Sequence, residues 1–362
     1  RFTYGWFIEA VETRVGPHRN RFGWYQTFPW IHKLMLQGGM AAEAAAAERK
    51  RFDAQKLKLF YRVKDSYYEY YYVARAIGVT RENAKLLKDF EEIARRKYRV
   101  GTVAHPDVIK AQVELGKIED RLRSLEDVRG PVVARLNTAL NRPVGMPVPE
   151  PSTVPEEKIE AGDDQVIAWM REGNPELAAM DFDIEKERRG VTLAKEWFIP
   201  DVTLGLDWIQ TDRAPMPTSD NGKDPIIANV AVNLPVWYDK YKAAEREAQA
   251  RFVAAQRARL DMENRLAYDM KMALYNYRDA ERKIDLYGRT LIPKGEESLR
   301  ATGTAYRAGN IDFLNLIDAQ RILIEFQLSH ERALADRAQR FAELEMLVGR
   351  EAPIGEDRKS VV

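Results

Sequence analysis

The feature that most restricts the fold of this chain is a heptad pattern of apolar residues in its second half. Its members are Leu266, Met270, Ala273, Tyr277, Ala280, Ile284, Tyr287 and Leu291. Steps that alternate between four and three residues are typical of helices that pack as coiled coils. The same spacing occurs in the first half at Val63, Tyr67, Tyr70, Ala74 and Ile77. Helices of about 50 residues are ~75 Å long, so they must turn back and pack side by side as antiparallel pairs.

The chain also contains two copies of one sequence pattern. The segment Tyr-Arg-Val-Gly at 98–101 returns as Tyr-Arg-Ala-Gly at 306–309, which is 208 residues later. Within 98–112, six of the fifteen residues are identical to their counterparts at this offset. A match of this length indicates an internal repeat. We therefore predict a first repeat at 1–142, a proline-rich linker at 143–163, a second repeat at 164–349 and a tail at 350–362.

Each repeat combines strand-like and helical segments. We predict β-hairpins at 1–30 and 200–237, because apolar or aromatic residues alternate there around polar turns. Two long helices should follow each hairpin. After the first hairpin we expect them at 41–95 and 106–137, in a helical region that covers 41–137. After the second we expect them at 240–291 and 312–348, in a helical region that covers 240–348. A further helix is expected at 164–196, before the second hairpin. The first hairpin lacks such a helix, and we expect a similar front helix to be missing.

Composition excludes several classes of protein. The charges of the 57 basic and 56 acidic side chains nearly cancel. The protein therefore has no strong positive electrostatic field that would attract nucleic acid, and we expect no nucleic-acid partner. The longest uncharged stretch, 225–238, has 14 residues, whereas a spanning helix needs about 20. Strands of a membrane barrel need only ~10 residues each, so that class stays open.

Sites for chemistry are absent from the sequence pattern. The chain has no Cys and four separated His residues, so we expect no metal site and no cofactor. None of the common nucleotide-binding, hydrolase or metalloprotease motifs occurs. We therefore predict that the protein is not an enzyme.

The order of these elements resembles the TolC-type outer-membrane efflux family. The residues that carry the resemblance are Asn-Pro-Glu-Leu at 174–177, Pro-Asp-Val-Thr-Leu-Gly at 200–205, Leu-Pro-Val at 234–236, and the repeated segments that begin at 98 and 306 and run to Asp-Ala-Gln at 318–320. The resemblance covers nearly the whole chain. It implies a mainly α fold with membrane β-strands, made of two tandem repeats of a β-hairpin and a long antiparallel coiled-coil pair.

The resemblance further implies a homotrimer in the bacterial outer membrane, with most of the chain in the periplasm. Each chain would give four strands to a shared twelve-stranded barrel in lipid and its helices to a periplasmic tunnel. The channel would be a passive exit duct, driven by an inner-membrane pump through a periplasmic adaptor. A drug, a metal ion and a protein remain equally possible as the exported substrate. A soluble periplasmic coiled-coil scaffold or stalk without channel activity is the alternative.

The lipid-facing residues of such a barrel follow from the alternation of its strands. They should be Val202, Leu204, Leu206, Val230, Val232 and Leu234, because lipid selects the apolar side. The residues between them, such as Asn229, Ala231 and Asn233, should face the other way. The aromatic residues Phe2, Tyr4, Trp6, Phe22 and Trp24 also suit lipid-facing or interfacial positions.

The resemblance places the periplasmic gate at the turns between paired helices. Gly101 and Gly309 begin these turns, Asp107 and Tyr306 match positions of the gate network, and Asp318 matches an acid that lines the constriction. Asn315 stands where some members carry a second acid, which puts an acidic double ring in doubt. Two alternatives remain open: Asp107 as an ordinary acid in the first turn of a helix, and His105 as an exposed loop residue rather than a pH-sensitive one.

Overall fold

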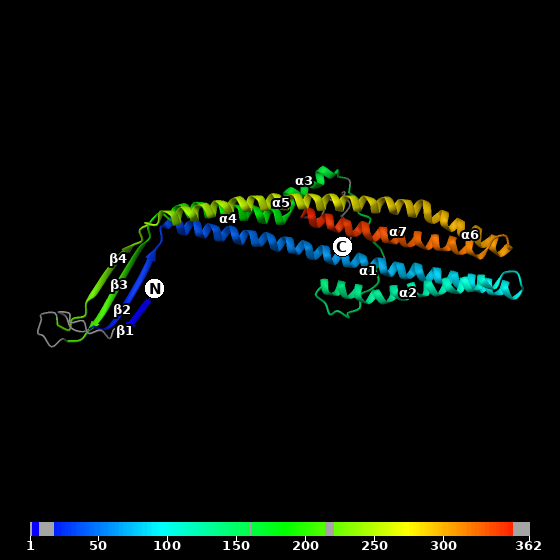
Figure 1. Ribbon diagram of the computed structural model, residues 1–362, viewed down its shortest axis with the longest axis horizontal. Helices are drawn as coiled ribbons and strands as arrows, with labels where there is room; N and C mark the ends of the chain where they lie inside the picture. Colours follow the sequence, from blue (N-terminus) through cyan, green and yellow to red (C-terminus); the bar gives the residue numbers. More distant parts are fainter. Residues whose placement is uncertain (1, 7–17, 152, 160, 214–220, 350–362) are drawn as a thin grey trace, which may run out of the picture. The chain divides into compact units, whose positions relative to one another are not determined.

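A computed structural model describes residues 2–6, 18–151, 153–159, 161–213 and 221–349, and it is mainly helical (Figure 1). The chain forms two compact units, one from 1–50 with 178–261 and the other from 51–177 with 262–362. The elements are β1 (Phe2–Trp6), β2 (His18–Phe28), α1 (Ile31–Arg99), α2 (His105–Ala139), α3 (Asp163–Gly173), α4 (Pro175–Glu196), β3 (Val202–Thr211), β4 (Ile226–Val232), α5 (Tyr238–Asp285), the π-helix η1 (Leu286–Leu291), α6 (Ile292–Ala308) and α7 (Phe313–Val348). None of the helices in these ranges combines the length and hydrophobicity needed to cross a bilayer. The expected tail at 350–362 lies outside the described residues.

The first unit contains one antiparallel sheet in the order β1-β2-β3-β4. Both predicted hairpins are present as β1–β2 and β3–β4, and β2 pairs with β3 along almost its whole length, from Thr211 opposite His18 to Val202 opposite Phe28. The turn of the first hairpin lies outside the described residues. The pairing of β2 with β3 joins strands far apart in the sequence, so the sheet unites the two repeats.

The first long helix begins earlier than predicted. Helix α1 starts at Ile31, directly after Pro29 and Trp30, and runs through Gly38 and Gly39, where the sequence indicated a start near 41. The guanidinium group of Arg189 on α4 lies against Gly39 and binds Glu43 at 2.9 Å. A Cβ at position 39 would collide with this guanidinium group. The glycine thus allows close packing, which offsets its poor helix propensity of about 1 kcal/mol.

Two proline residues change the predicted helices in opposite ways. The helix expected to end at 291 continues to Ala308 through Pro293, because the π-helix before it rearranges the backbone bonds: the Ile292 N–H donates to the Tyr287 carbonyl. The helix expected at 164–196 instead breaks before Pro175. There the Asn174 side chain accepts a hydrogen bond from the Glu176 N–H at 2.9 Å and caps α4.

The second unit has two hydrophobic clusters. One joins α1, α2, α6 and α7 around Leu87, Ile118, Tyr306 and Phe313, and the other joins α3, α5 and α7. The predicted heptad positions of α5 are buried from Leu266 to Ala280, which confirms the coiled-coil pattern there. The pattern for α1 holds in part: its members Tyr70 and Ile77 are buried, but Tyr67 is 36% exposed. Tyr68 and Tyr71, which lie outside the pattern, are buried as well.

Candidate functional site at the strands and at the helical turns

The two faces of the sheet differ in chemistry. Cross-strand pairing puts Val202 opposite Val232 and Leu204 opposite Val230, so these residues share one face with Leu206. All five side chains are exposed, as are Trp24 and Trp208 on the same face. Leu234 is exposed as well, but it lies beyond the end of β4. Phe22 stacks on Trp208 on the apolar face, whereas the side chains of Phe2, Tyr4 and Trp6 lie outside the described set.

The opposite face carries a polar network centred on Asp207, a buried carboxylate. Arg21 donates to both oxygens of Asp207, at 3.1 and 2.8 Å, and the Tyr25 hydroxyl donates to it at 2.5 Å. The Asn229 amide also donates to Asp207, at 2.7 Å. A bidentate pair with further donors satisfies a buried charge well. The sheet therefore separates an apolar face from a hydrogen-bonded polar face.

The two turns between paired helices in the second unit have the same backbone conformation. Gly101 and Gly309 are both left-handed, with φ of 71° and 81°. The N–H of Thr102 donates to the Lys97 carbonyl and that of Asn310 to the Ala305 carbonyl, both at 2.9 Å. These groups are related by the offset of 208 residues. The pattern ends a helix through a left-handed backbone conformation, which glycine adopts more readily than any other residue.

Tyr306 is the most enclosed of the predicted tip residues. Its ring packs on Phe313 at 5.4 Å between centroids. The Lys97 ammonium group lies over the Tyr306 ring, 4.8 Å from its centroid, and donates to the Tyr306 carbonyl at 2.5 Å. Burial, and secondarily the Asp107 carboxylate, raises the pKa of Tyr306 to about 12. No described residue makes a hydrogen bond to its buried hydroxyl. Asp107 and Tyr306 are thus close enough to interact electrostatically, but the structure contains no hydrogen bond between them.

The other residues predicted at the tip are exposed or half-buried. Asp107 lies in the first turn of α2, 3.7 Å from the Lys110 ammonium group. His105 is exposed and packs against the Tyr98 ring at 5.1 Å. Asn315 is exposed near the start of α7. Both descriptions of Asp107, as a helix-start acid and as a neighbour of Tyr306, therefore apply to the same side chain.

Asp318 is exposed, but it is paired with a cation. Arg321 contacts Asp318 at 3.3 Å and binds both carboxylate oxygens of Glu114 on α2. Lys117 contacts Glu114 at 2.9 Å. Hydrogen bonding to Arg321 lowers the pKa of Glu114. The four side chains carry two positive and two negative charges, so Asp318 does not act as an isolated acid.

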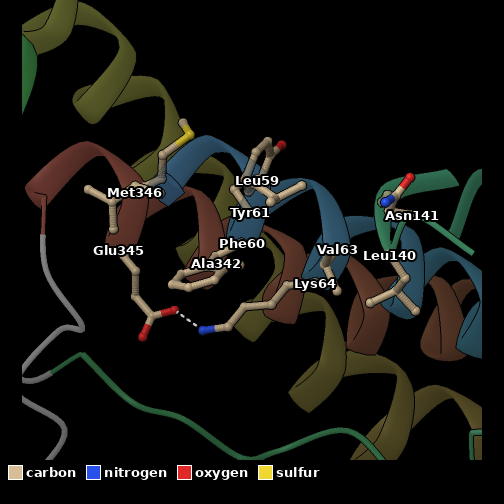
Figure 2. A pocket seen from close by; sticks show the side chains of 12 residues that line it. Leu59, Phe60, Tyr61, Val63, Lys64, Leu140, Asn141, Ala342, Glu345 and Met346 are labelled. Carbon is tan, nitrogen blue, oxygen red and sulfur yellow. Dashed lines mark hydrogen bonds and ion pairs between the residues drawn. The ribbon is translucent and has the colours of Figure 1, made fainter. Parts of the chain in front are cut away.

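The second unit also contains an apolar pocket of about 560 Å³ at the far end of α2 from its turn (Figure 2). It lies between α1, the residues that follow α2, and the end of α7. An ion pair joins Lys64 to Glu345, two of its lining residues. Across the described residues there is no group of three or more His, Cys, Asp or Glu side chains that could hold a metal ion.

Comparison with known proteins assigns the family. The model of the outer membrane efflux protein family matches residues 166–350, slightly more than half of the chain. The chain belongs to this family. It is similar to nodulation protein T of Rhizobium leguminosarum bv. trifolii, at 23% identity over 335 residues that cover 85% of this chain and 67% of that protein. It is also similar to the cobalt-zinc-cadmium resistance protein CzcC of Cupriavidus metallidurans, at 22% identity over 337 residues covering 88% and 75%.

Solved structures give the same assignment for the fold. The outer membrane protein VceC of Vibrio cholerae matches 97% of this efflux protein and 85% of its own chain, with a TM-score of 0.79 and 15% identity. The predicted family is confirmed, and with it a location in the bacterial outer membrane with a large helical part in the periplasm. The family and its structural neighbours are channels rather than enzymes.

Sequence reasoning missed several residues at and near the two helical turns of the efflux protein. Lys97, Phe313, Glu114 and Arg321 all make the contacts described above. Phe313 could have been found, because it is the counterpart of His105 at the offset of 208 residues. The ion pair between Glu114 and Arg321 joins two helices of different repeats, and no spacing within one helix signals such a contact.

Proposed function

We propose that three copies of this chain form one outer-membrane channel, with twelve strands in a shared barrel and the helices in a periplasmic tunnel. The observation that carries this proposal is the four-stranded sheet with an apolar, exposed face. Its outer strands, β1 and β4, each have one edge that no described strand pairs. Open edges are unstable in lipid, and pairing β4 of one chain with β1 of the next removes them.

The channel is a passive exit duct for substrates that an inner-membrane pump delivers through a periplasmic adaptor. The match to the outer membrane efflux protein family supports this role. The two turns at Gly101 and Gly309 form the periplasmic gate, where Asp107 and Tyr306 hold the closed state and Asp318 lines the constriction.

A measurement of mass and conductance tests this function. The full chain, extracted with detergent from an outer-membrane fraction, should have the mass of a trimer and form channels in planar bilayers. Release from the membrane by salt alone, together with a monomeric mass, would instead favour the soluble coiled-coil scaffold.

A pair of substitutions tests which face meets lipid. Val232→Arg should impair assembly by about 2–4 kcal/mol if residue 232 lies near the bilayer midplane, because an arginine on the lipid face is costly there. Ala231→Arg, one residue earlier and on the opposite face, should be milder. Heat stability of the trimer on electrophoresis measures both, and equal losses would contradict the assignment of the lipid-facing side.

A further inference from the structure

Two apolar side chains at the tip have no assigned role. Val113 on α2 and Ile322 on α7 are each 50% exposed. Each is next in sequence to a member of the ionic link between the repeats, since Val113 precedes Glu114 and Ile322 follows Arg321. Exposed apolar residues that stand singly need no explanation, but these two are related to each other.

The relation follows from the internal repeat. At the offset of 208 residues, Val113 is the counterpart of Arg321, and Glu114 is the counterpart of Ile322. The register holds at both ends of the two helices. The turn hydrogen bonds of Thr102 and Asn310 match before the helices, and the left-handed residues Asn141 and Gly349 match after them. The first of these two positions holds Val113 in one repeat and Arg321 in the other, and the second holds Glu114 and Ile322. The ion pair takes one residue from each position, and the two apolar residues are the remaining pair.

A closed ring of identical chains needs two different surfaces on each chain, one for each neighbour. Within the chain, α7 of the second repeat contacts α2 of the first through Arg321 and Glu114. If the contact between chains repeats this one, α2 of the second copy meets α7 of the first. Val113 then takes the position of Arg321, and Ile322 takes the position of Glu114.

We infer that Ile322 of one chain packs against Val113 of a second copy, so that the joint between chains is apolar where the joint within a chain is ionic. This inference rests on the trimeric channel proposed above. A second copy suits these residues because they lie on two different helices and are the counterparts of Arg321 and Glu114, which join the repeats within one chain.

The two joints respond to different conditions. Separation of the two helix pairs within a chain breaks the ion pair between Arg321 and Glu114. Salt screens this ion pair, because the Arg321 side chain is 46% exposed. Separation of the chains exposes Val113 and Ile322 to water. Salt does not weaken the apolar contact between these two side chains. A tip that opens between chains therefore opens without losing its ion pairs.

Chemical cross-linking tests the inference directly. The chain contains no Cys, so Val113→Cys with Ile322→Cys supplies the sole pair of thiols. The detergent-solubilised full chain is treated with a short bismaleimide and analysed by denaturing electrophoresis. We expect covalent dimers and trimers. The matched control, Glu114→Cys with Arg321→Cys, uses the same two positions in the swapped combination, and we expect a link within one chain and no increase in mass.

The native mass, measured before cross-linking, separates the two possible failures. A trimer in which the Val113 and Ile322 thiols give no covalent dimer, while the control reacts, overturns the inference and leaves the proposed channel intact. A monomeric wild-type chain overturns both. Contact of these residues with an adaptor instead would give the first of these results.

A second variant does not depend on thiol chemistry. Ile322→Glu alone should reduce the yield of trimer, and addition of Val113→Arg should restore it and make it sensitive to salt, because the joint between chains then carries the ion pair found within the chain. Equal loss in the single and the double variant would count against the contact.

Discussion

In the turn between α1 and α2, the rings of Tyr98 and His105 pack at 5.1 Å, and in the turn between α6 and α7 those of Tyr306 and Phe313 pack at 5.4 Å. The two pairs are related by the offset of 208 residues and follow the same backbone. Their surroundings differ, because Tyr98 is 44% exposed and Tyr306 only 2%. Lys97 of the first turn and the hydrophobic cluster around Phe313 cover the second pair.

This difference shows which properties of a repeat are local. The backbone hydrogen bonds and the aromatic pair depend on residues a few positions apart, so both turns have them. Burial of the aromatic pair depends on a neighbouring pair of helices. Among the described residues of one chain, only the turn between α6 and α7 has such a neighbour. The same sequence motif therefore forms a core in one place and a surface in the other.

The largest expected effect comes from the aromatic partners. Phe313→Ala should lower the free energy of unfolding by about 3–5 kcal/mol, because it leaves a cavity in a buried cluster. His105→Ala, at the equivalent exposed position, should change it by less than about 0.5 kcal/mol. Denaturant unfolding in detergent measures both. Similar losses would show that the assembled protein also buries the first turn.

The glycines test whether the backbones are equivalent. Gly101→Ala and Gly309→Ala should each cost about 1–2 kcal/mol, since both residues are left-handed and open space surrounds both. Gly116→Ala is the control, in an exposed helical position with open space around it. It should stabilise α2 by about 0.5–1 kcal/mol. Unequal costs at Gly101 and Gly309 would contradict the shared turn geometry.

The gate assignment predicts a functional difference between the turns. Asp107→Ala with Tyr306→Phe should raise single-channel conductance in planar bilayers, because it removes the carboxylate and the hydroxyl to which the proposal assigns the closed state. The equivalent pair, Asn315→Ala with Tyr98→Phe, should leave conductance unchanged. If neither double variant alters conductance, Asp107 is a helix-start acid and the gate lies elsewhere.

The smallest effect concerns pH and the link between α2 and α7. The folded-state pKa of Glu114 is lowered, so its ion pair with Arg321 adds stability above the ordinary carboxyl range near 4.3 and loses it as the pH falls. The Arg321 side chain is half-exposed, so solvent screens the pair and its contribution to stability is about 1 kcal/mol.

Unfolding of wild type and Glu114→Gln should therefore differ at neutral pH and converge in acid. Glu119→Gln, on another face of the same helix, should match wild type throughout. A difference between wild type and Glu114→Gln that persists below the titration range would mean that packing rather than charge joins the helices.

Much of the fold followed from periodicity. The heptad positions Leu266 to Ala280 are buried as predicted, and the alternation in β3 and β4 separates apolar from polar residues. The heptad prediction was less accurate where several neighbouring apolar residues could each lie on the buried face of the helix. In the tyrosine-rich part of α1 nearly every position could be apolar, and α7 selects among them, for example through the bond from Tyr71 to Glu331.

Helix ends were less accurate than helix centres. Gly38 and Gly39 look like a helix start, and Pro293 looks like a helix end, yet helices continue through all three. Arg189 fills the space that Gly39 leaves, and a π-helix accommodates Pro293. Both solutions come from contacts or backbone adjustments that no local propensity describes.

The sequence by itself determined the heptads, the two turns, the alternating strands and the family, because each depends on residues a few positions apart or on motifs repeated along the chain. The tertiary structure decided that β2 pairs with β3, that Tyr306 rather than Tyr98 is buried, and that Arg321 binds Glu114. These contacts join residues of the two repeats. Identical local patterns allow several such pairings, and only the packing of whole helices and strands selects one of them.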